Sequence, residues 1–284
     1  MLNNKVHQLF TSQLTDWGQA STNYQALKQV KVKTLDVNGS LFHIQLNPAR
    51  ITSVTARNDA QFLQARKCFL CSENRPPEQR GIPFGKKYTI LVNPFPIFAR
   101  HLTIPSVEHT LQRIASRFED MLDLARQLDD YIIFYNGPKC GASAPDHFHF
   151  QAGNKGFLPI ENNPNRHNAI HFESANKQDI LNRFTQVYNS LPLQQDDDEP
   201  RFNLLVWHER GQWITCLFPR SKQRPACYHA EGSANLLITP GSVEMGGVII
   251  TPLEKDFEKI TAEDIARIMH EVTVNVTVDN NKNK

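Results

Sequence analysis

The segment NGPKCGASAPDHFHFQ, residues 136–151, carries most of what this sequence says about fold and function. It joins a loop of small residues to a run in which aromatic and polar residues alternate. Side chains on a β-strand point alternately to its two faces. A strand over 147–151 would therefore turn Phe148 and Phe150 toward a core and leave a polar set on the opposite face. That polar set is His147, His149 and Gln151.

The loop ahead of this run has the small residues that a phosphate site needs. Gly137, Gly141 and Ser143 permit close backbone approach, and their amide groups can receive phosphate oxygens. A neutral histidine beside such a loop can attack phosphorus, hold a nucleotide covalently and release it to a second acceptor. Each feature alone has a plainer interpretation, because paired histidines can share one metal or lie on the surface, and glycines often mark an ordinary turn. Their combination in one short segment favours a catalytic site.

The patterns on either side of this segment predict an α+β fold. Apolar residues at three- and four-residue steps predict a helix over 107–129, and further helices are expected over 177–191 and 262–272. Apolar and alternating runs predict strands over 30–37, 41–45, 88–92, 102–104, 131–135, 202–209, 212–218 and 246–251. Because strands and helices do not alternate regularly, α+β is favoured over a doubly wound α/β sheet.

The acidic segment LQQDDDEP at 193–200 is the best candidate for a linker. It separates an N-terminal half, residues 1–192, which contains the histidine segment, from a C-terminal half, residues 201–278. The polar tail from Asp279 is expected to fray. The sequence thus predicts two parts, with the chemistry in the first.

Composition excludes several classes of function. The 284 residues carry a net charge of only +2, which argues against a nucleic-acid binder with its concentrated basic face. No stretch has the length of apolar sequence that a membrane span needs, and the N-terminus does not resemble a signal peptide. The five cysteines are an odd number and include a CxxC pair, which is typical of an intracellular protein with thiols available for metal. We therefore expect a cytoplasmic protein.

The HFHFQ run at 147–151 resembles the HxHxQ signature of a known superfamily of histidine-triad-like enzymes. Its members include galactose-1-phosphate uridylyltransferase, diadenosine tetraphosphate phosphorylase and GDP-hexose phosphorylases. The resemblance covers about residues 65–165, including NPFPIFARHLTIPSVEH at 93–109 and FLPIE at 157–161. It is faint over 200–270, where FPR at 218–220 is suggestive. It implies an α+β histidine-triad-like fold of antiparallel sheets with packed helices, in two related halves.

The resemblance also implies roles for individual residues. His149 matches the nucleophile, and Gln151 matches the glutamine that hydrogen-bonds the phosphoryl group. Positions lining the phosphates in the family match Asn136, Gly141 and Ser143. Lys139 and Arg220 are further candidates for contact with phosphate or sugar phosphate, although such residues are often only solvated surface charge.

Cys68 and Cys71 are candidate metal ligands that need two partners for a tetrahedral zinc site. The resemblance implies that the partners are His109 and His147, with His101 as a substitute for His109. His147 would then brace the strand through a structural zinc while His149 stays free to react. A redox thiol pair and two inert buried cysteines are the alternatives.

The sequence thus predicts a nucleotidyltransferase or phosphorylase that works through a covalent nucleotidyl-histidine. Its donor would be a nucleoside diphosphate sugar or a dinucleoside polyphosphate, and its acceptor phosphate or a sugar phosphate. Relatives often pair, which implies a homodimer. A nucleotide hydrolase, a non-catalytic nucleotide-binding protein and a cupin-like metalloprotein are the rivals. In the cupin-like case His147 and His149 would share one metal.

Overall fold

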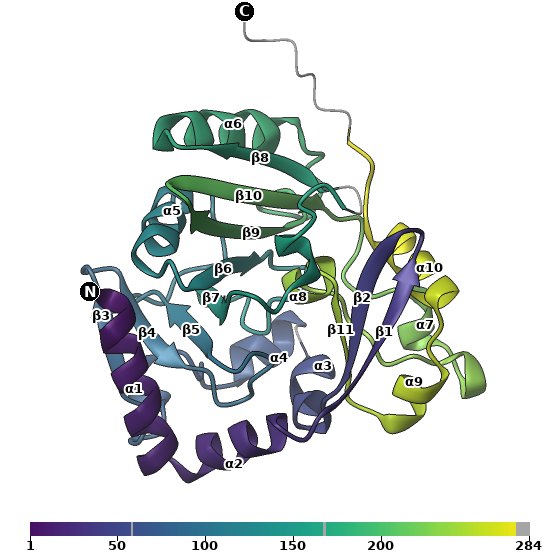
Figure 1. The fold of residues 1–284 in the computed structure, drawn as a ribbon, viewed down its shortest axis with the longest axis horizontal. Helices are drawn as coiled ribbons and strands as arrows, with labels where there is room; N and C mark the ends of the chain where they lie inside the picture. The colour runs from purple at the N-terminus through teal and green to yellow at the C-terminus, as the bar shows by residue number, and fades with distance from the viewer. Residues whose placement is uncertain (58, 167–168, 277–284) are drawn as a thin grey trace, which may run out of the picture.

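An eight-stranded antiparallel sheet forms the centre of the computed structural model, which describes residues 1–57, 59–166 and 169–276 (Figure 1). The strands run in the order β3-β4-β5-β7-β6-β9-β10-β8. Their bounds are β3 Gly81–Phe84, β4 Tyr88–Val92, β5 His101–Pro105, β6 Tyr131–Asn136, β7 His149–Asn154, β8 Ile170–Ser174, β9 Phe202–Glu209 and β10 Gln212–Pro219. The segment that carries HxHxQ therefore lies between β5 and β6, near the middle of the sheet.

A second, three-stranded sheet consists of β1 (Lys31–Val37), β2 (Ser40–Leu46) and β11 (Val248–Thr251). Asn38 and Gly39 turn between β1 and β2 with φ of 52° and 81°, the left-handed backbone expected of an Asn-Gly hairpin turn. β11 pairs with β2 in parallel, a departure from the predicted antiparallel sheets. The long chain between these two strands makes that direction possible, because a parallel pair needs a crossover connection.

Apolar cores fill both faces of the large sheet. One core lies between that sheet and the longer helices α1 (Leu2–Asp16), α5 (Phe118–Gln127) and α6 (Lys177–Ser190). The other lies between the opposite face and the small sheet, together with α8 (Ser242–Met245) and α10 (Ala262–Val272). The remaining helices are α2 Gly18–Leu27, α3 Ile51–Val54, α4 Ala60–Ala65, α7 Ala226–His229 and α9 Glu254–Lys259, with 3₁₀ turns at Pro48–Arg50, Ser72–Asn74, Pro159–Glu161 and Gly232–Ala234.

The predicted helix over 107–129 is wrong in its first half. Residues 107–117 are not helical, and α5 starts only at Phe118. Backbone groups of this segment bond to the chain around the histidines instead, as in Phe148 N to Thr110 O (2.6 Å) and Gln112 N to Pro145 O (3.0 Å). Val107 and Leu111, which contributed to the helical pattern, are exposed. Tertiary hydrogen bonding here overrides the local periodicity.

The other predicted elements are confirmed to within a few residues, and strands on both sides of residues 193–200 join one sheet through the β6–β9 pair. Residues 193–200 lie outside helices and strands. The division into halves at this segment stays a prediction. Residues 277 and 278 of the C-terminal half and the tail from Asp279 lie outside the described residues. In the part of the chain that is described, no helix is long and apolar enough to cross a membrane.

Candidate active site and metal cluster

The alternation of the HFHFQ run separates core from site as predicted. Phe148 and Phe150 are fully buried in the core that carries α1, α5 and α6. His149 and Gln151 therefore face the other side of the sheet, toward the small sheet and α8. β7 begins at His149 and not at His147, so the first histidine lies in the loop just before the strand. The two histidines thus point into different surroundings.

His149 has the properties of a neutral nucleophile. Its side chain is buried, and Nδ1 lies 2.9 Å from the backbone oxygen of His147. Because a carbonyl can only accept, Nδ1 carries the proton and Nε2 keeps its lone pair. Burial lowers the pKa of His149 to about 4, so the ring is uncharged at neutral pH. Among the described residues, no hydrogen bond occupies Nε2, which leaves that atom available to react.

The side-chain amide of Gln151 is oriented by His101, which lies beside it on β5. The backbone N–H of Ile97 donates to Nδ1 of His101 (3.2 Å), so the proton of the neutral ring is on Nε2. That Nε2–H donates to Oε1 of Gln151 (3.0 Å). The amide nitrogen of Gln151 is then left to donate elsewhere. His101 is therefore not available as a substitute metal ligand.

Arg50 is a cation near His101 and was not predicted from the sequence. It ends a short 3₁₀ turn after β2, and its Nη1 donates to the backbone oxygen of Phe95 (2.7 Å). Burial lowers its pKa to about 10, against the opposing charge of Glu244, so it stays protonated at neutral pH. After burial, the charge of Arg50 is the main factor that lowers the pKa of His101. No local pattern distinguishes Arg50, because its position depends on distant segments.

The glycine-rich loop packs tightly against the C-terminal part of the chain. Gly141 has φ of +99°, and a Cβ there would lie 3.0 Å from Cα of Gly241. Ser143, on the same loop, borders a small cavity of about 20 Å³. Buried side-chain atoms of Arg224 and Thr239 that lack a hydrogen-bond partner border it as well. Arg224 and Thr239 were not predicted from the sequence, because they come from two distant segments, one on each side of α7 and the 3₁₀ turn at Gly232–Ala234.

Asn136 holds the end of β6 to the first residue of α8. Its Oδ1 accepts from Nδ2 of Asn203 (2.8 Å), the backbone nitrogen of Ser242 (2.7 Å) and Oγ of Ser242 (2.8 Å). The oxygen is therefore fully engaged within the protein. Any contact of Asn136 with substrate has to use its amide nitrogen.

Two predicted substrate contacts are engaged elsewhere. Arg220 is buried, and its guanidinium donates to Asn203 and to backbone oxygens of Lys222, Pro240 and Val272 among others. Arg220 bonds to Asn203, which in turn bonds to Asn136. Because its donors are used within the protein, the direct substrate contact predicted for Arg220 does not fit this arrangement. Lys139 forms an ion pair with Asp197 in the 193–200 segment, and its substrate role stays a prediction.

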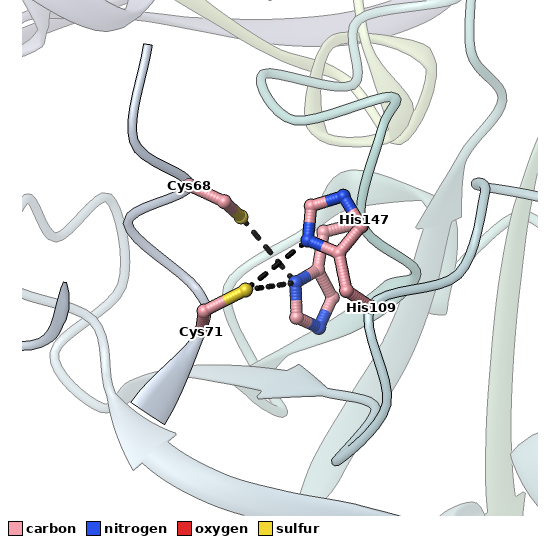
Figure 2. Close-up of side chains that lie close together, drawn as sticks. All are labelled: Cys68, Cys71, His109 and His147. Carbon is pink, nitrogen blue, oxygen red and sulfur yellow. Dashed lines mark hydrogen bonds between the residues drawn. The ribbon is translucent and has the colours of Figure 1, made fainter. Parts of the chain in front are cut away.

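The four predicted metal ligands lie together (Figure 2), with candidate ligand atoms all within 4.8 Å of one another. Nδ1 of His147 is 3.3 Å from Sγ of Cys68 and 3.5 Å from Sγ of Cys71, and Nδ1 of His109 is 3.1 Å from Sγ of Cys71. Tetrahedral zinc with ordinary bond lengths separates a sulfur from a nitrogen ligand by about 3.6 Å. The cluster thus has a size and a donor set that could hold a metal ion.

Neighbouring groups orient these side chains. Nε2 of His147 donates to the backbone oxygen of Ser106 (2.9 Å), which leaves Nδ1 toward the cysteines. Nε2 of His109 lies 3.8 Å from a carboxylate oxygen of Asp146, which also pairs with Arg66. Burial opposes ionisation of the Cys68 thiol, but the hydrogen bond with His147 and those with the backbone at Leu70 and Cys71 together outweigh it and lower its pKa to about 6. The cluster therefore includes an easily ionised thiol, as a metal ligand should be.

One cavity of the described structure lies apart from these residues. It has a volume of about 320 Å³ and is lined in part by His43, Lys155, Glu161 and Glu209. None of the predicted catalytic, substrate-binding or metal-binding residues borders it. We therefore place the candidate site at the histidine strand and not in this cavity.

Comparison with known proteins relates the fold to a family. The family model described as domain of unknown function DUF4922 matches residues 9–154, more than half of the chain, and the one described as GDPGP1-like, C-terminal domain matches residues 161–278. No curated protein matches the chain.

Solved structures of yeast Ap4A phosphorylase Apa2 have a similar fold. The complex with Ap4A has a TM-score of 0.64 at 17% identity, covering 96% of this chain and 97% of that one. The complex with AMP has a TM-score of 0.58 at 17% identity, covering 95% and 99%. Sequence motif, family models and fold agree. The chain belongs to the DUF4922 family, its C-terminal part matches the GDPGP1-like C-terminal domain, and its fold is similar to that of yeast Ap4A phosphorylase.

Proposed function

We propose that this protein is a nucleotidyltransferase or phosphorylase that carries the nucleotide on Nε2 of His149. The observation that carries the proposal is the state of the His149 ring. The ring is buried and neutral, its proton is on Nδ1, and no described residue forms a hydrogen bond with Nε2. A lone pair held in this way is suited to attack on phosphorus. The HxHxQ signature at 147–151 and the GDPGP1-like match of the C-terminal part support nucleotide chemistry as the use of such a histidine.

The reaction takes place in two displacements. In the first, the Nε2 lone pair of His149 forms a bond to the α-phosphorus of the donor, and the bond from phosphorus to the bridging oxygen breaks, so the rest of the donor leaves with that electron pair. In the second, an oxygen of the acceptor phosphate attacks the same phosphorus and the N–P bond breaks. The ring is cationic only in between. The hydrogen bond from Nδ1 to the His147 carbonyl then stabilises that positive charge.

Gln151 and Arg50 have supporting roles in this proposal. The Gln151 amide nitrogen, free because His101 engages the oxygen, donates to the phosphoryl group during transfer. Arg50 contributes positive charge near His101, which in turn bonds to Gln151, and this charge can compensate that of a polyphosphate. Ser143 and the backbone around Gly141 receive further phosphate oxygens. These groups are positioned before substrate arrives, so they favour the transition state at little cost in reorganisation.

We infer a nucleoside diphosphate sugar or a dinucleoside polyphosphate as donor, and phosphate or a sugar phosphate as acceptor. The yeast structures with similar folds were solved with Ap4A and AMP, which supports a nucleotide as the transferred group. Glutamine at 151 favours transfer over hydrolysis, because an amide cannot act as an acid or base near neutral pH. A cytoplasmic location and a homodimer stay predictions.

We also propose that the ion held by Cys68, Cys71, His109 and His147 is a structural zinc. Two sulfur and two nitrogen donors match the ligand set of closed zinc sites. When bound, zinc ties the 68–71 turn to the loop that precedes β7. His147 then fixes the loop through its side chain, and its backbone oxygen holds the ring of His149.

The test is product analysis with a panel of UDP-, GDP- and ADP-sugars and dinucleoside polyphosphates, each with and without inorganic phosphate. Transfer to phosphate yields a nucleoside diphosphate and depends on phosphate, whereas hydrolysis yields a nucleoside monophosphate and does not. Phosphate-dependent formation of the diphosphate is expected. Monophosphate alone would establish the hydrolase instead, and tight nucleotide binding without any product, when a panel of sugar phosphates is also offered as acceptors, would establish a binding protein.

A further inference from the structure

The ladder between β6 and β7 stops short of the reactive histidine. The two strands pair from Tyr131 opposite Asn154 as far as Phe134 opposite Gln151. Continued in the same register, Asn136 would stand opposite His149, but no strand pairing joins them. The backbone at His149 is thus left without its β6 partner, although it lies in the centre of a sheet.

The side chain of Gln112 occupies this gap. Its Oε1 accepts from the backbone nitrogen of His149 (2.8 Å), and its Nε2 donates to the backbone oxygens of His149 (3.0 Å) and Asn136 (3.1 Å). One side-chain amide therefore makes the hydrogen bonds that a paired strand would supply. The orientation of the amide is unambiguous, because only its oxygen can face an N–H and only its nitrogen can face two carbonyls.

Gln112 is itself held rigidly. It is completely buried, its backbone nitrogen donates to Pro145 O (3.0 Å), and its backbone oxygen accepts from the hydroxyl of Tyr135 (3.1 Å). That hydroxyl also bonds to the buried carboxyl group of Glu199 in the 193–200 segment. Residue 112 thus connects β6, β7 and the loop between them, and it is anchored to a fourth segment.

We propose that Gln112 is the positioning residue of His149: its amide keeps β6 and β7 apart and fixes where the reactive ring stands. This inference rests on the proposed transfer reaction for its functional consequence, but not for its structural part. A side chain that lacks the amide leaves three buried backbone groups without partners. The two strands then shift toward each other or admit water, and either change moves the imidazole relative to the phosphorus.

The experiment compares Gln112→Met with Gln112→Asn and with a matched control, Gln13→Met. Methionine retains the length and much of the volume of glutamine without its polar atoms, while asparagine keeps the amide on a shorter stem. Gln13 is equally buried and also bridges backbone groups, with Nε2 to Glu78 O (2.7 Å) and Oε1 from Arg80 N (3.1 Å). It belongs to α1, and both of these side-chain hydrogen bonds go to residues 78–80 and not to β7.

Three quantities are measured on the full chain: amide hydrogen exchange over 147–151, the ¹⁵N shifts of the His149 ring, and kcat and KM for phosphorolysis. Both Gln112 variants should exchange the His149 amide at least about 10-fold faster and change the ring shifts. In both, kcat should fall about 100-fold while KM stays within a few-fold, as expected when a reacting group is misplaced. Gln13→Met should lose stability but keep all three near wild-type values.

Unchanged exchange at His149 in both Gln112 variants would overturn the proposal. So would faster exchange with kcat within about threefold of the wild-type value, because the amide would then hold the strand without positioning the ring. An inactive wild-type chain would refute the proposed transfer reaction, and exchange and ring shifts would then decide the role of Gln112. If one Gln112 variant fails to fold, the other carries the comparison.

Discussion

The buried His101 should make the protein sensitive to acid, by an amount that its surroundings allow us to state. Burial, and next the charge of Arg50, lower the pKa of His101 from 6.5 to about 3. The folded protein therefore keeps this ring neutral where the unfolded chain protonates it. The contribution of the neutral His101 ring to the free energy of unfolding is fully present above pH 6.5 and is lost as the pH falls from 6.5 toward 3.

The expected magnitude follows from linkage. The full difference in pKa corresponds to about 5 kcal/mol, and between pH 7 and pH 5 about 2 kcal/mol of it is lost. His101→Gln can still donate to Gln151 but has no proton to gain. Every other titrating group is shared by the two proteins, so the difference between them isolates His101.

Urea denaturation at pH 7 and pH 5 measures this difference. The wild-type free energy of unfolding should fall by about 2 kcal/mol more than that of His101→Gln over this interval. Equal losses in the two proteins would contradict the low pKa of His101. They would mean that His101 can accept a proton in the folded state, in which case the orientation assigned to the Gln151 amide would no longer follow from its neighbour.

Two further substitutions test the metal cluster and the glycine loop. Cys71→Ser should lose bound zinc, as measured by metal analysis, and should melt at a lower temperature. Cys227→Ser, which lies outside the cluster, should keep the metal. Metal retained in Cys71→Ser would contradict the assignment. Gly141→Ala should cost about 1–3 kcal/mol of unfolding free energy from backbone strain, plus the clash with Gly241. The control is Gly39→Ala, where φ is +81° and the added Cβ meets open space, so the loss of unfolding free energy should come from backbone strain alone. A similar loss in both variants would show that the chain at Gly241 moves aside for the new Cβ without further cost.

Much of the fold could be predicted because it depends on local pattern. The alternation of HFHFQ separated buried phenylalanines from His149 and Gln151, and the Asn38-Gly39 turn and the helix at 262–272 were visible in the sequence. The helix over 107–129 failed for a physical reason. Its first half makes long-range hydrogen bonds around the histidines, and local periodicity carries no information about such bonds.

The site could be predicted only where its residues are close in sequence or match a known motif. Cys68 and Cys71 were visible from their spacing, and the family resemblance supplied His109 and His147; the structure brings the four together in a cluster that could hold a metal ion. Arg50 and Gln112 gave no signal, since their roles depend on contacts with segments more than twenty residues away. Arg220 was misjudged for the related reason that sequence does not reveal whether an arginine's donors are already satisfied.

The central claim, a nucleotide carried on His149, is tested most directly by the mass of the intact protein. Wild type and His149→Gly are mixed, without acceptor, with the donor that supports turnover, and the masses and metal contents are compared. Wild type should gain the mass of one nucleoside monophosphate, labile in acid and absent from His149→Gly, with zinc retained in both. An adduct that persists in His149→Gly would contradict the central claim, as would no adduct on a folded, metal-loaded wild type that turns the donor over.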